Sequence, residues 1–297
     1  MSENFCSYSR FSLWLMAARP KTLPAAAAPV LVGTAAAYSA GLFAFFPALA
    51  AFFGALLLQI AVNLANDYFD AKNEIDSEQR VGPVRVTQSG LIPPKQVKLA
   101  MIITLAAAAL VFVYLILVGG TVIFWVAAAS VLAALAYSGG PWPIASHGLG
   151  ELFVFIFFGL VAVCGTYWVQ ARSLTAFVLL ASVSPGLLIS AIMMINNLRD
   201  IKTDAPAGKN TLAVKLGRAR FILLFKVVIG MAYLFLLPLA IYGQSMTILL
   251  PAASSPLAVM VCREAAECSG ASLNKTLAKT AQLALLFSAL LAVGIIL

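Results

Sequence analysis

The sequence predicts an all-α membrane protein, a polytopic bundle of nine transmembrane helices preceded by a short interfacial helix. Three observations lead to this fold class. The chain of 297 residues is 62% hydrophobic and only 10% charged, whereas soluble domains are about 25% charged. Its mean hydropathy is +0.99. Its apolar runs are continuous rather than alternating, which favours helices over a β-barrel. We treat residues 1–297 as a single integral-membrane domain.

Each transmembrane helix needs about 20 predominantly apolar residues. The segment 9–18 is too short to span a membrane and is amphipathic, so we expect it to lie along the membrane surface. The connections 67–96 and 198–220 are long and carry most of the charged residues. The nine predicted spans are 22–41, 47–66, 97–118, 121–137, 149–170, 174–197, 221–242, 246–262 and 278–296.

The basic residues predict the orientation of the bundle. Of the 19 Lys and Arg residues, all except Arg172 fall in the N-terminal segment, in the connections after even-numbered spans, or at the start of the third, seventh or ninth span. Such a bias marks the cytoplasmic side. We therefore expect a cytoplasmic N-terminus and an external C-terminus. The same bias explains the net charge of +8 without a nucleic-acid partner.

The acidic residues gather in two short stretches, each at the end of a predicted span. Seven of the eleven Asp and Glu residues lie in 67–78 or 200–204. Carboxylates at a membrane boundary are costly unless they are paired or hold a cation. Because both stretches fall on the predicted cytoplasmic side, we expect them to form one site in the loops 67–96 and 198–220. A structural interpretation, as helix caps or partners of loop cations, stays open for each carboxylate.

Helical spacing would bring oxygen ligands of the first stretch onto shared faces. If the second span continues past residue 66, Asn63, Asp67 and Asp70 share one face. Asn66 and Asp70 form an adjoining stripe, which Glu74 extends.

In the second stretch, Asn196, Asp200 and Asp204 recur every four residues. Neither Cys nor His accompanies the two stretches. Ligation by oxygen alone suits Mg²⁺ or Mn²⁺, and Mg²⁺ commonly takes one or two carboxylates together with substrate phosphate.

Basic residues lie between and beside the acids, and they complete a diphosphate site. Carboxylates alone would repel phosphate, whereas carboxylates that hold Mg²⁺ beside Arg and Lys would bind it. A diphosphate site at the end of an apolar bundle indicates a lipid diphosphate whose tail lies among the helices. An allylic diphosphate ionises when the leaving charge is stabilised, and an aromatic ring can then attack the cation. The basic residues are Arg19, Lys21, Arg80, Arg85, Arg199, Lys202 and Lys209.

The chain resembles the UbiA-type membrane prenyltransferases, which carry two Asp-rich motifs in a nine-helix bundle. The resemblance runs from about residue 14 to the C-terminus. The Arg-Pro-Lys-Thr opening and the Asn-Asn-Leu-Arg-Asp motif favour the branch that acts on naphthoate in menaquinone synthesis. The matching stretches are 19–24 (RPKTLP), 63–68 (NLANDY) with Asp70 and Asp76, 82–85 (GPVR), 196–200 (NNLRD) with Asp204, and 208–211 (GKNT).

The resemblance implies a Mg²⁺-dependent transfer of a polyprenyl chain from its diphosphate to 1,4-dihydroxy-2-naphthoate. The ring carboxylate would leave as CO₂, and the products would be demethylmenaquinone and diphosphate. It also implies an enzyme in the lipid of a bacterial cytoplasmic (inner) membrane. By this resemblance, the catalytic and metal-binding residues include Asn66, Asp67, Asp70, Asp200 and Asp204. Glu74 or Asp76 would be a further acidic ligand.

The same resemblance implies a set of substrate-binding residues. Tyr137 is counted with them, although an aromatic side chain at a span end is also typical of the membrane interface. Lys21 would lie near the aromatic acceptor or the diphosphate. The set is Lys21, Asn63, Asn66, Arg80, Arg85, Tyr137, Asn196, Asn197, Arg199 and Lys209.

Two other interpretations stay open. The first is another UbiA-type enzyme, acting on 4-hydroxybenzoate, homogentisate, a chlorophyllide or haem. The second is a cation transporter with the carboxylates as its ion path, although transporters place their sites near the bilayer midplane on broken helices. The sequence sets neither the prenyl chain length nor the oligomeric state.

Overall fold

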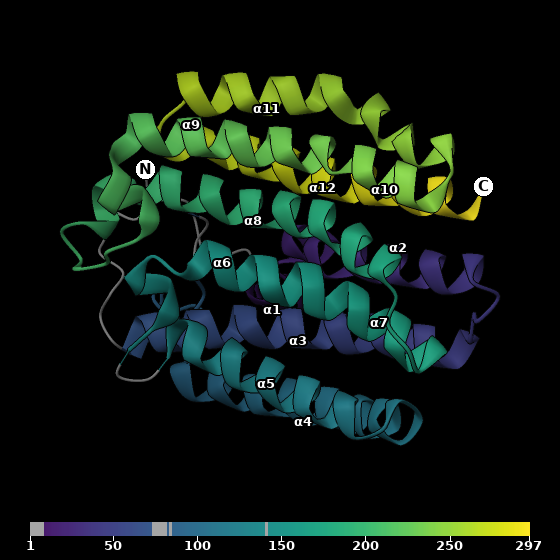
Figure 1. Cartoon of the computed structure of the whole chain (residues 1–297). Helices are drawn as coiled ribbons and strands as arrows, with labels where there is room; N and C mark the ends of the chain where they lie inside the picture. The colour runs from purple at the N-terminus through teal and green to yellow at the C-terminus, as the bar shows by residue number, and fades with distance from the viewer. Residues whose placement is uncertain (1–8, 73–81, 83–84, 140–141) are drawn as a thin grey trace.

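In the computed structural model, the chain forms a bundle of helices that run roughly along one long axis (Figure 1). The structure describes residues 9–72, 82, 85–139 and 142–297. Nine helical segments of this described part run along the bundle. Six of them are α2 (Leu23–Ser39), α3 (Phe45–Lys72), α4 (Pro94–Gly119), α5 (Thr121–Ser138), α8 (Ala176–Asp204) and α12 (Leu273–Ile296).

The other three segments change helical type along their length. The first combines α6 (Gly150–Val154), the π-helical η4 (Phe155–Val161) and α7 (Ala162–Ala171). The second combines α9 (Leu212–Leu234) and α10 (Leu236–Gly243), and the third combines η5 (Met246–Ser254) and α11 (Ser255–Glu267). Seven of the nine segments are long and apolar enough to cross a membrane. The two shorter ones are α2, with 17 residues, and α5, with 18. The predicted all-α class is confirmed, and the nine segments agree with the nine predicted spans.

The connections divide between the two ends of the bundle. The short ones after α2, α4, α7 and α10 lie at the end where α12 terminates (Figure 1). The ends of α3 and α8, which carry the acidic stretches, lie at the opposite end (Figure 1). Both acidic stretches therefore share one end of the molecule.

Two helices continue past the ends that hydropathy predicted. Residues 67–72 belong to α3 and residues 198–204 to α8, so the prediction that these residues lie in the connections 67–96 and 198–220 was wrong. Hydropathy detects only apolar side chains, whereas backbone hydrogen bonds continue a helix wherever its polar side chains are enclosed by protein. The acidic side chains consequently project from rigid helix ends.

The middle of α8 packs very closely against η4. A Cβ atom at Gly186 would lie 2.8 Å from the Cα of Gly159, and one at Gly159 would lie 2.7 Å from the Cα of Gly186. The two backbones therefore touch, as small residues allow in membrane bundles. This contact fixes α8 against a π-helical stretch, a feature that is frequent at functional sites.

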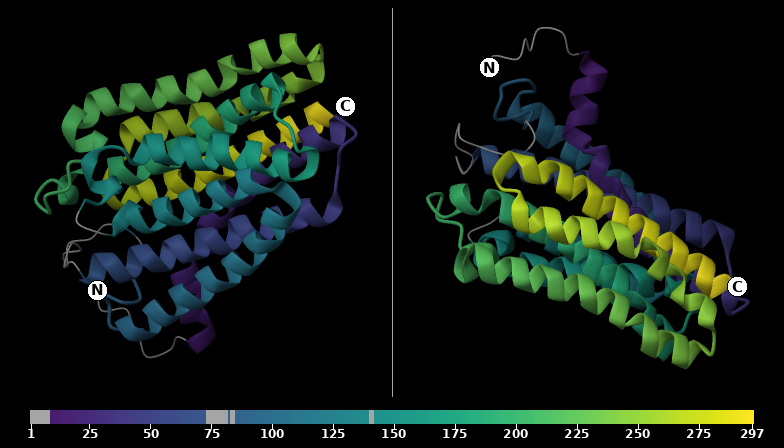
Figure 2. Two further views of the ribbon diagram at one scale, coloured as in Figure 1. Left: turned by 60° about the horizontal axis from the view of Figure 1, so that its bottom comes forward. Right: turned by 90° about the horizontal axis from the view of Figure 1, so that it is seen from above.

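A short helix, α1 (Arg10–Ala18), precedes the bundle and agrees with the predicted amphipathic segment. Ser9 caps it by accepting a hydrogen bond from the backbone N–H of Ser12 at 3.2 Å. Ala17 is buried in a small apolar cluster with Leu64 of α3, whereas Phe11 is 76% exposed. Figure 2 shows α1 inclined steeply to the bundle helices. The helix therefore has one face on the protein and one face available to the membrane.

Candidate active site

A cavity of about 400 Å³ runs inside the bundle between α2, α3, α5, η4, α7 and α8. One end of it is polar, and the remainder is lined mainly by Ala, Val, Leu, Ile and Phe side chains. Its size falls within the range of small-molecule sites. Eleven of the predicted catalytic, metal-binding and substrate-binding residues line it, namely Lys21, Asn63, Asn66, Asp70, Arg85, Tyr137, Asn196, Asn197, Asp200, Asp204 and Lys209.

One wall of the cavity is a polar stripe along α3. Gln59, Asn63, Asn66 and Asp70 all line the cavity and follow one another at intervals of four, three and four residues. This spacing keeps side chains on one helical face. The wall therefore carries three amides that lead to one carboxylate at the polar end.

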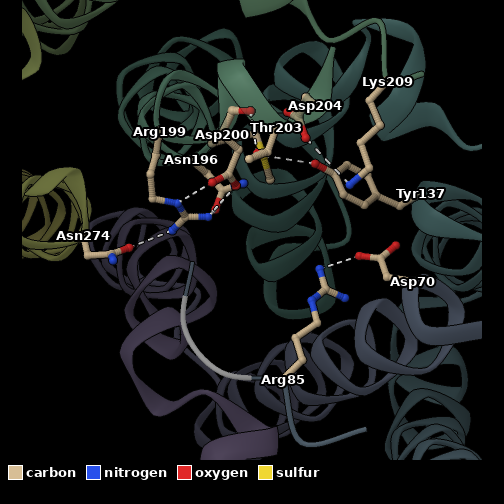
Figure 3. Close-up of polar contacts among 11 residues, drawn as sticks. Asp70, Arg85, Tyr137, Asn196, Arg199, Asp200, Thr203, Asp204, Lys209 and Asn274 are labelled. Atoms are coloured by element: carbon tan, nitrogen blue, oxygen red, sulfur yellow. Dashed lines mark hydrogen bonds and ion pairs between the residues drawn. The ribbon is translucent and has the colours of Figure 1, made fainter. Parts of the chain in front are cut away.

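The carboxylate of this wall is paired with a buried arginine. Arg85 forms an ion pair with Asp70 through one terminal nitrogen (Figure 3). Its other terminal nitrogen donates a hydrogen bond to the backbone carbonyl of Asn66. Asp70 is 6% exposed and Arg85 is 8% exposed. A buried carboxylate needs such compensation, and Arg85 brings it from the chain segment that follows α3.

Asp67 was predicted to be a metal ligand, but its environment is that of a carboxylate bound to the backbone. It is 1% exposed, and its two carboxylate oxygens accept hydrogen bonds from the backbone N–H groups of Val86 and Thr87 at 3.2 and 3.3 Å. It is absent from the cavity lining found in the described residues. The geometry favours a role in fixing the segment that holds Arg85.

The facing wall is formed by α8. Asn196, Asp200 and Asp204 lie on it at the predicted spacing of four residues, and all three line the cavity. Asn197, also on the wall, donates a hydrogen bond of 2.8 Å to the carboxylate of Glu151 in α6. The two acidic stretches, from distant parts of the sequence, thus border one cavity.

Arg199 lies behind this wall and orients its central carboxylate. It donates to both oxygens of Asp200, at 2.7 and 2.6 Å, in a bidentate pair (Figure 3). It also donates to the side-chain oxygens of Asn196 at 2.8 Å and of Asn274, on α12, at 2.9 Å. These bonds use four of the five guanidinium N–H groups. The geometry favours a positioning role over the predicted contact with diphosphate.

The outer end of the α8 wall carries a looser ion pair. The ammonium of Lys209 lies 3.8 Å from the carboxylate of Asp204 (Figure 3). Nearby, the hydroxyl of Tyr137 donates to the sulfur of Met193 at 3.2 Å. Because a pair at this distance is not tightly bound, Lys209 is placed to exchange its partner for a phosphate oxygen.

The oxygen donors of the two walls fit a divalent metal that substrate and water help to bind. Among the described residues, no three His, Cys, Asp or Glu side chains lie close enough to hold a metal by themselves. The carboxylates instead face a shared space from two walls. The Oδ1 atom of Asn66 is buried and has no hydrogen-bond partner in the described part of the chain. An unsatisfied oxygen beside Asp70 fits the hard, oxygen-binding Mg²⁺ when substrate and water complete its shell.

Three predicted residues, Glu74, Asp76 and Arg80, lie outside the described residues. The choice between Glu74 and Asp76 as a further ligand therefore stays open.

Sequence reasoning missed several polar neighbours of the site. Gln59 could have been found, because it lies four residues before Asn63 on the same helical face. Asn274 gave no such signal, since it lies on α12, far along the sequence from Arg199. Glu151 became identifiable as a partner only through its contact with Asn197.

Fold and site together define a class: integral membrane prenyltransferases, with two acidic walls at the polar end of an apolar cavity. The chain belongs to the UbiA prenyltransferase family, whose model matches residues 26–295.

The chain is similar to curated members of this family. It is 43% identical over 223 residues to the 1,4-dihydroxy-2-naphthoate octaprenyltransferase of Escherichia coli, covering 70% of each chain. It is 43% identical over 222 residues to the enzyme of the same name from Mycobacterium tuberculosis, covering 75% of this chain and 76% of the relative. The namesake from Haemophilus influenzae is 38% identical, with 76% of each chain covered.

Solved structures share the fold. A UbiA homologue from Archaeoglobus fulgidus bound to DMAPP and Mg²⁺ aligns with a TM-score of 0.67 at 14% identity, over 95% of this chain and 98% of that one. A UbiA homologue from Aeropyrum pernix without ligand aligns with a TM-score of 0.62 at 17% identity, over 90% and 96%.

Proposed function

We propose that this protein transfers a polyprenyl chain from polyprenyl diphosphate to 1,4-dihydroxy-2-naphthoate, with release of CO₂ and diphosphate. The single observation that carries the proposal is the cavity whose polar end lies between the α3 and α8 walls and whose remainder is apolar. A diphosphate head would lie at the polar end, and an isoprenoid tail would extend along the apolar part. The choice of acceptor rests on the relatives named for this acceptor, at 38 to 43% identity.

The diphosphate would lie between the two walls. Asn66, Asp70, Asp200 and Asp204 would hold Mg²⁺, and Arg85 and Lys209 would contact phosphate oxygens. When bound, the metal would neutralise charge on the leaving diphosphate. Support for the metal comes from the unsatisfied oxygen of Asn66 and from the oxygen-only donor set of the walls. The A. fulgidus homologue, bound to Mg²⁺ with DMAPP or GPP, supports it by family likeness.

The apolar part of the cavity would protect the reaction from water. Phe153, Phe157 and Phe158 line it beside alanine side chains of α5. An allylic cation that forms at the polar end would therefore meet the aromatic ring rather than solvent. In this arrangement the protein orients the substrates, stabilises the developing charge and excludes water. It needs no covalent nucleophile.

The expected surroundings are the lipids of a bacterial cytoplasmic membrane, with the polar end of the cavity at the cytoplasmic face. The basic residues of the connections at that end support this orientation. The orientation is measured by introducing single cysteines into the connections and labelling them from either side of inverted vesicles. Labelling at both the 205–211 connection and the 171–176 connection from the same side would contradict it.

The function is tested with purified protein in lipid vesicles, Mg²⁺ and octaprenyl diphosphate. 1,4-Dihydroxy-2-naphthoate, 4-hydroxybenzoate and homogentisate are offered separately, and products are identified by mass. We expect prenylated, decarboxylated naphthol product from the first acceptor. A product from another acceptor alone would refute the acceptor assignment. Metal uptake into vesicles without any prenyl product would indicate a transporter instead.

A further inference from the structure

A small polar cluster lies on the cavity wall, deeper in the bundle than the carboxylates. It consists of Thr22, Gln59 and Asn63, all of which line the cavity. The side-chain nitrogen of Gln59 lies 3.2 Å from the hydroxyl oxygen of Thr22 and 3.5 Å from the side-chain oxygen of Asn63. The side-chain nitrogen of Asn63 lies 2.9 Å from that hydroxyl and 2.9 Å from the backbone carbonyl of Ala18.

The hydrogen bonds of this cluster fix which end of the Gln59 amide faces it. The hydroxyl of Thr22 has one hydrogen, and it donates this hydrogen to the backbone carbonyl of Arg19 at 2.9 Å. The hydroxyl must therefore accept from both of its amide neighbours. Asn63 must direct its nitrogen towards Ala18, because a carbonyl can only accept. The oxygen of Asn63 then faces Gln59, so Gln59 also directs its nitrogen into the cluster.

The amide oxygen of Gln59 is consequently directed away from the cluster. Gln59 is 8% exposed, and its Oε1 atom is buried without a hydrogen-bond partner in the described part of the chain. An unsatisfied buried acceptor is costly, and native structures rarely retain one without a reason. Gln59 lines the cavity, so a small shift of its buried amide lets a ligand in the cavity supply the missing donor.

The next step rests on the proposed function. Of the two substrates, a fully ionised polyprenyl diphosphate has no N–H or O–H donor. The aromatic acceptor has two hydroxyl groups. The 1-hydroxyl is ortho to the carboxylate, and its hydrogen is held by an internal hydrogen bond. The 4-hydroxyl is free to donate.

We propose that Gln59 Oε1 accepts a hydrogen bond from the 4-hydroxyl of the naphthoate acceptor. Gln59 is thus a substrate-binding residue that orients the ring, and Thr22 and Asn63 are positioning residues that hold its amide. A hydrogen bond accepted from the hydroxyl also increases electron density in the ring, which favours attack on an allylic cation. The amide takes no proton, so it leaves the acceptor otherwise unchanged.

The first experiment uses the unaltered protein and varies the ligand. Binding of 1,4-dihydroxy-2-naphthoate and of 1-hydroxy-2-naphthoate is measured by calorimetry in detergent without oxygen. The analogue lacks only the 4-hydroxyl. We expect it to bind at least about tenfold more weakly, because its loss leaves Gln59 unsatisfied again. Equal affinity for the two ligands would overturn the inference, whatever happens to any variant.

The second experiment varies the protein. Gln59→Met keeps the length of the side chain and removes its acceptor. We expect this variant to bind 1,4-dihydroxy-2-naphthoate about tenfold more weakly and the analogue as the parent does, so that the preference disappears. The KM for octaprenyl diphosphate should not change. A merely structural role would weaken both ligands equally and leave the preference in place, which would refute the assignment.

Ser130→Ala serves as the matched control. Ser130 also lines the cavity, but its hydroxyl donates to Val126 of its own helix at 2.8 Å. We expect Ser130→Ala to keep the full preference for 1,4-dihydroxy-2-naphthoate over the analogue. Loss of this preference in Ser130→Ala would also contradict the assignment to Gln59. If Gln59→Met fails to fold, the ligand comparison on the unaltered protein decides. If that protein binds and prenylates no dihydroxynaphthoate at all, the proposed function fails and this inference falls with it.

Discussion

The two acidic walls of the cavity solve the same electrostatic problem in different ways. Each presents a buried or half-buried aspartate whose charge is compensated by an arginine. On α3, Asp70 pairs with Arg85, which comes from outside the helix. On α8, Asp200 pairs with its own neighbour Arg199, which Asn274 of α12 also holds.

This difference indicates how far each wall is organised before substrate arrives. The α8 pair lies within one helix and is anchored to a second, so its geometry is fixed by the bundle itself. The α3 pair depends on the segment 85–90, which Asp67 holds through two backbone hydrogen bonds. We interpret the α8 wall as a preorganised half of the site and the α3 wall as the half whose geometry a loop controls.

The largest expected effect comes from removing the proposed Mg²⁺, which would disable both walls at once. EDTA should abolish prenyl transfer completely, and Mg²⁺ in excess should restore it, because the leaving diphosphate is then neutralised again. Product formation in vesicles is the measurement, and the melting temperature of the protein before and after EDTA is the control. Full turnover in EDTA-treated, metal-free protein would show that the walls act without a cation.

Next in size are Asp70→Asn and Asp200→Asn. We expect each to lower kcat by about 10³-fold, as loss of a charged group at a transition state commonly does. Each also removes a charged partner of a buried arginine, so the melting temperature should fall as well. Single-turnover assays on protein that remains folded, as shown by circular dichroism, separate the two effects. Retained turnover in either variant would remove that residue from the catalytic site.

Asp67→Asn tests whether Asp67 has a structural role and not the catalytic role of Asp70, a difference that the sequence alone did not show. Its two oxygens accept from the backbone N–H groups of Val86 and Thr87, and asparagine keeps only one acceptor. We expect a lower melting temperature with a loss of activity below about tenfold, through the segment that holds Arg85. The comparison with Asp70→Asn in one assay is the test. Equal losses of kcat in the two variants would return Asp67 to the catalytic residues.

A smaller effect is expected from Asn274→Ala, which tests the anchor of the α8 wall. The change leaves one Arg199 donor unsatisfied and permits the guanidinium to move, so Asp200 loses its fixed direction. We expect kcat/KM for the prenyl diphosphate to fall about tenfold. Asn274→Asp keeps an acceptor and should restore most of this loss. No change in Asn274→Ala would mean that the bidentate pair alone orients Asp200.

The sequence predicted the fold class, the nine segments and the stripe Asn196, Asp200, Asp204, because apolar runs and helical spacing are local properties. It could not separate the roles of Asp67 and Asp70, which lie three residues apart. The difference depends on whether a backbone N–H or an arginine faces each one, and that is set by the segment 85–90. The anchor Asn274 was equally beyond reach, since its contact with Arg199 joins α12 to α8.

The smallest change tests whether the packing of α8 maintains the preorganised wall. In Gly186→Ala, the new Cβ would lie 2.8 Å from the Cα of Gly159 and 3.0 Å from the ring of Phe155. Because one of these neighbours is backbone, α8 or η4 must shift, at a cost of about 1–3 kcal/mol. This exceeds the gain of about 1 kcal/mol from replacing glycine by alanine within a helix.

We therefore expect Gly186→Ala to melt a few degrees lower and to lose activity only modestly, mainly through Asp200. Gly230→Ala on α9 is the matched control, since its new Cβ meets no described atom within 4 Å. That variant should melt at the same temperature or higher. If both variants melt alike, the contact between the two glycines does not fix α8, and the stiffness of its wall must come from Arg199 and Asn274 instead.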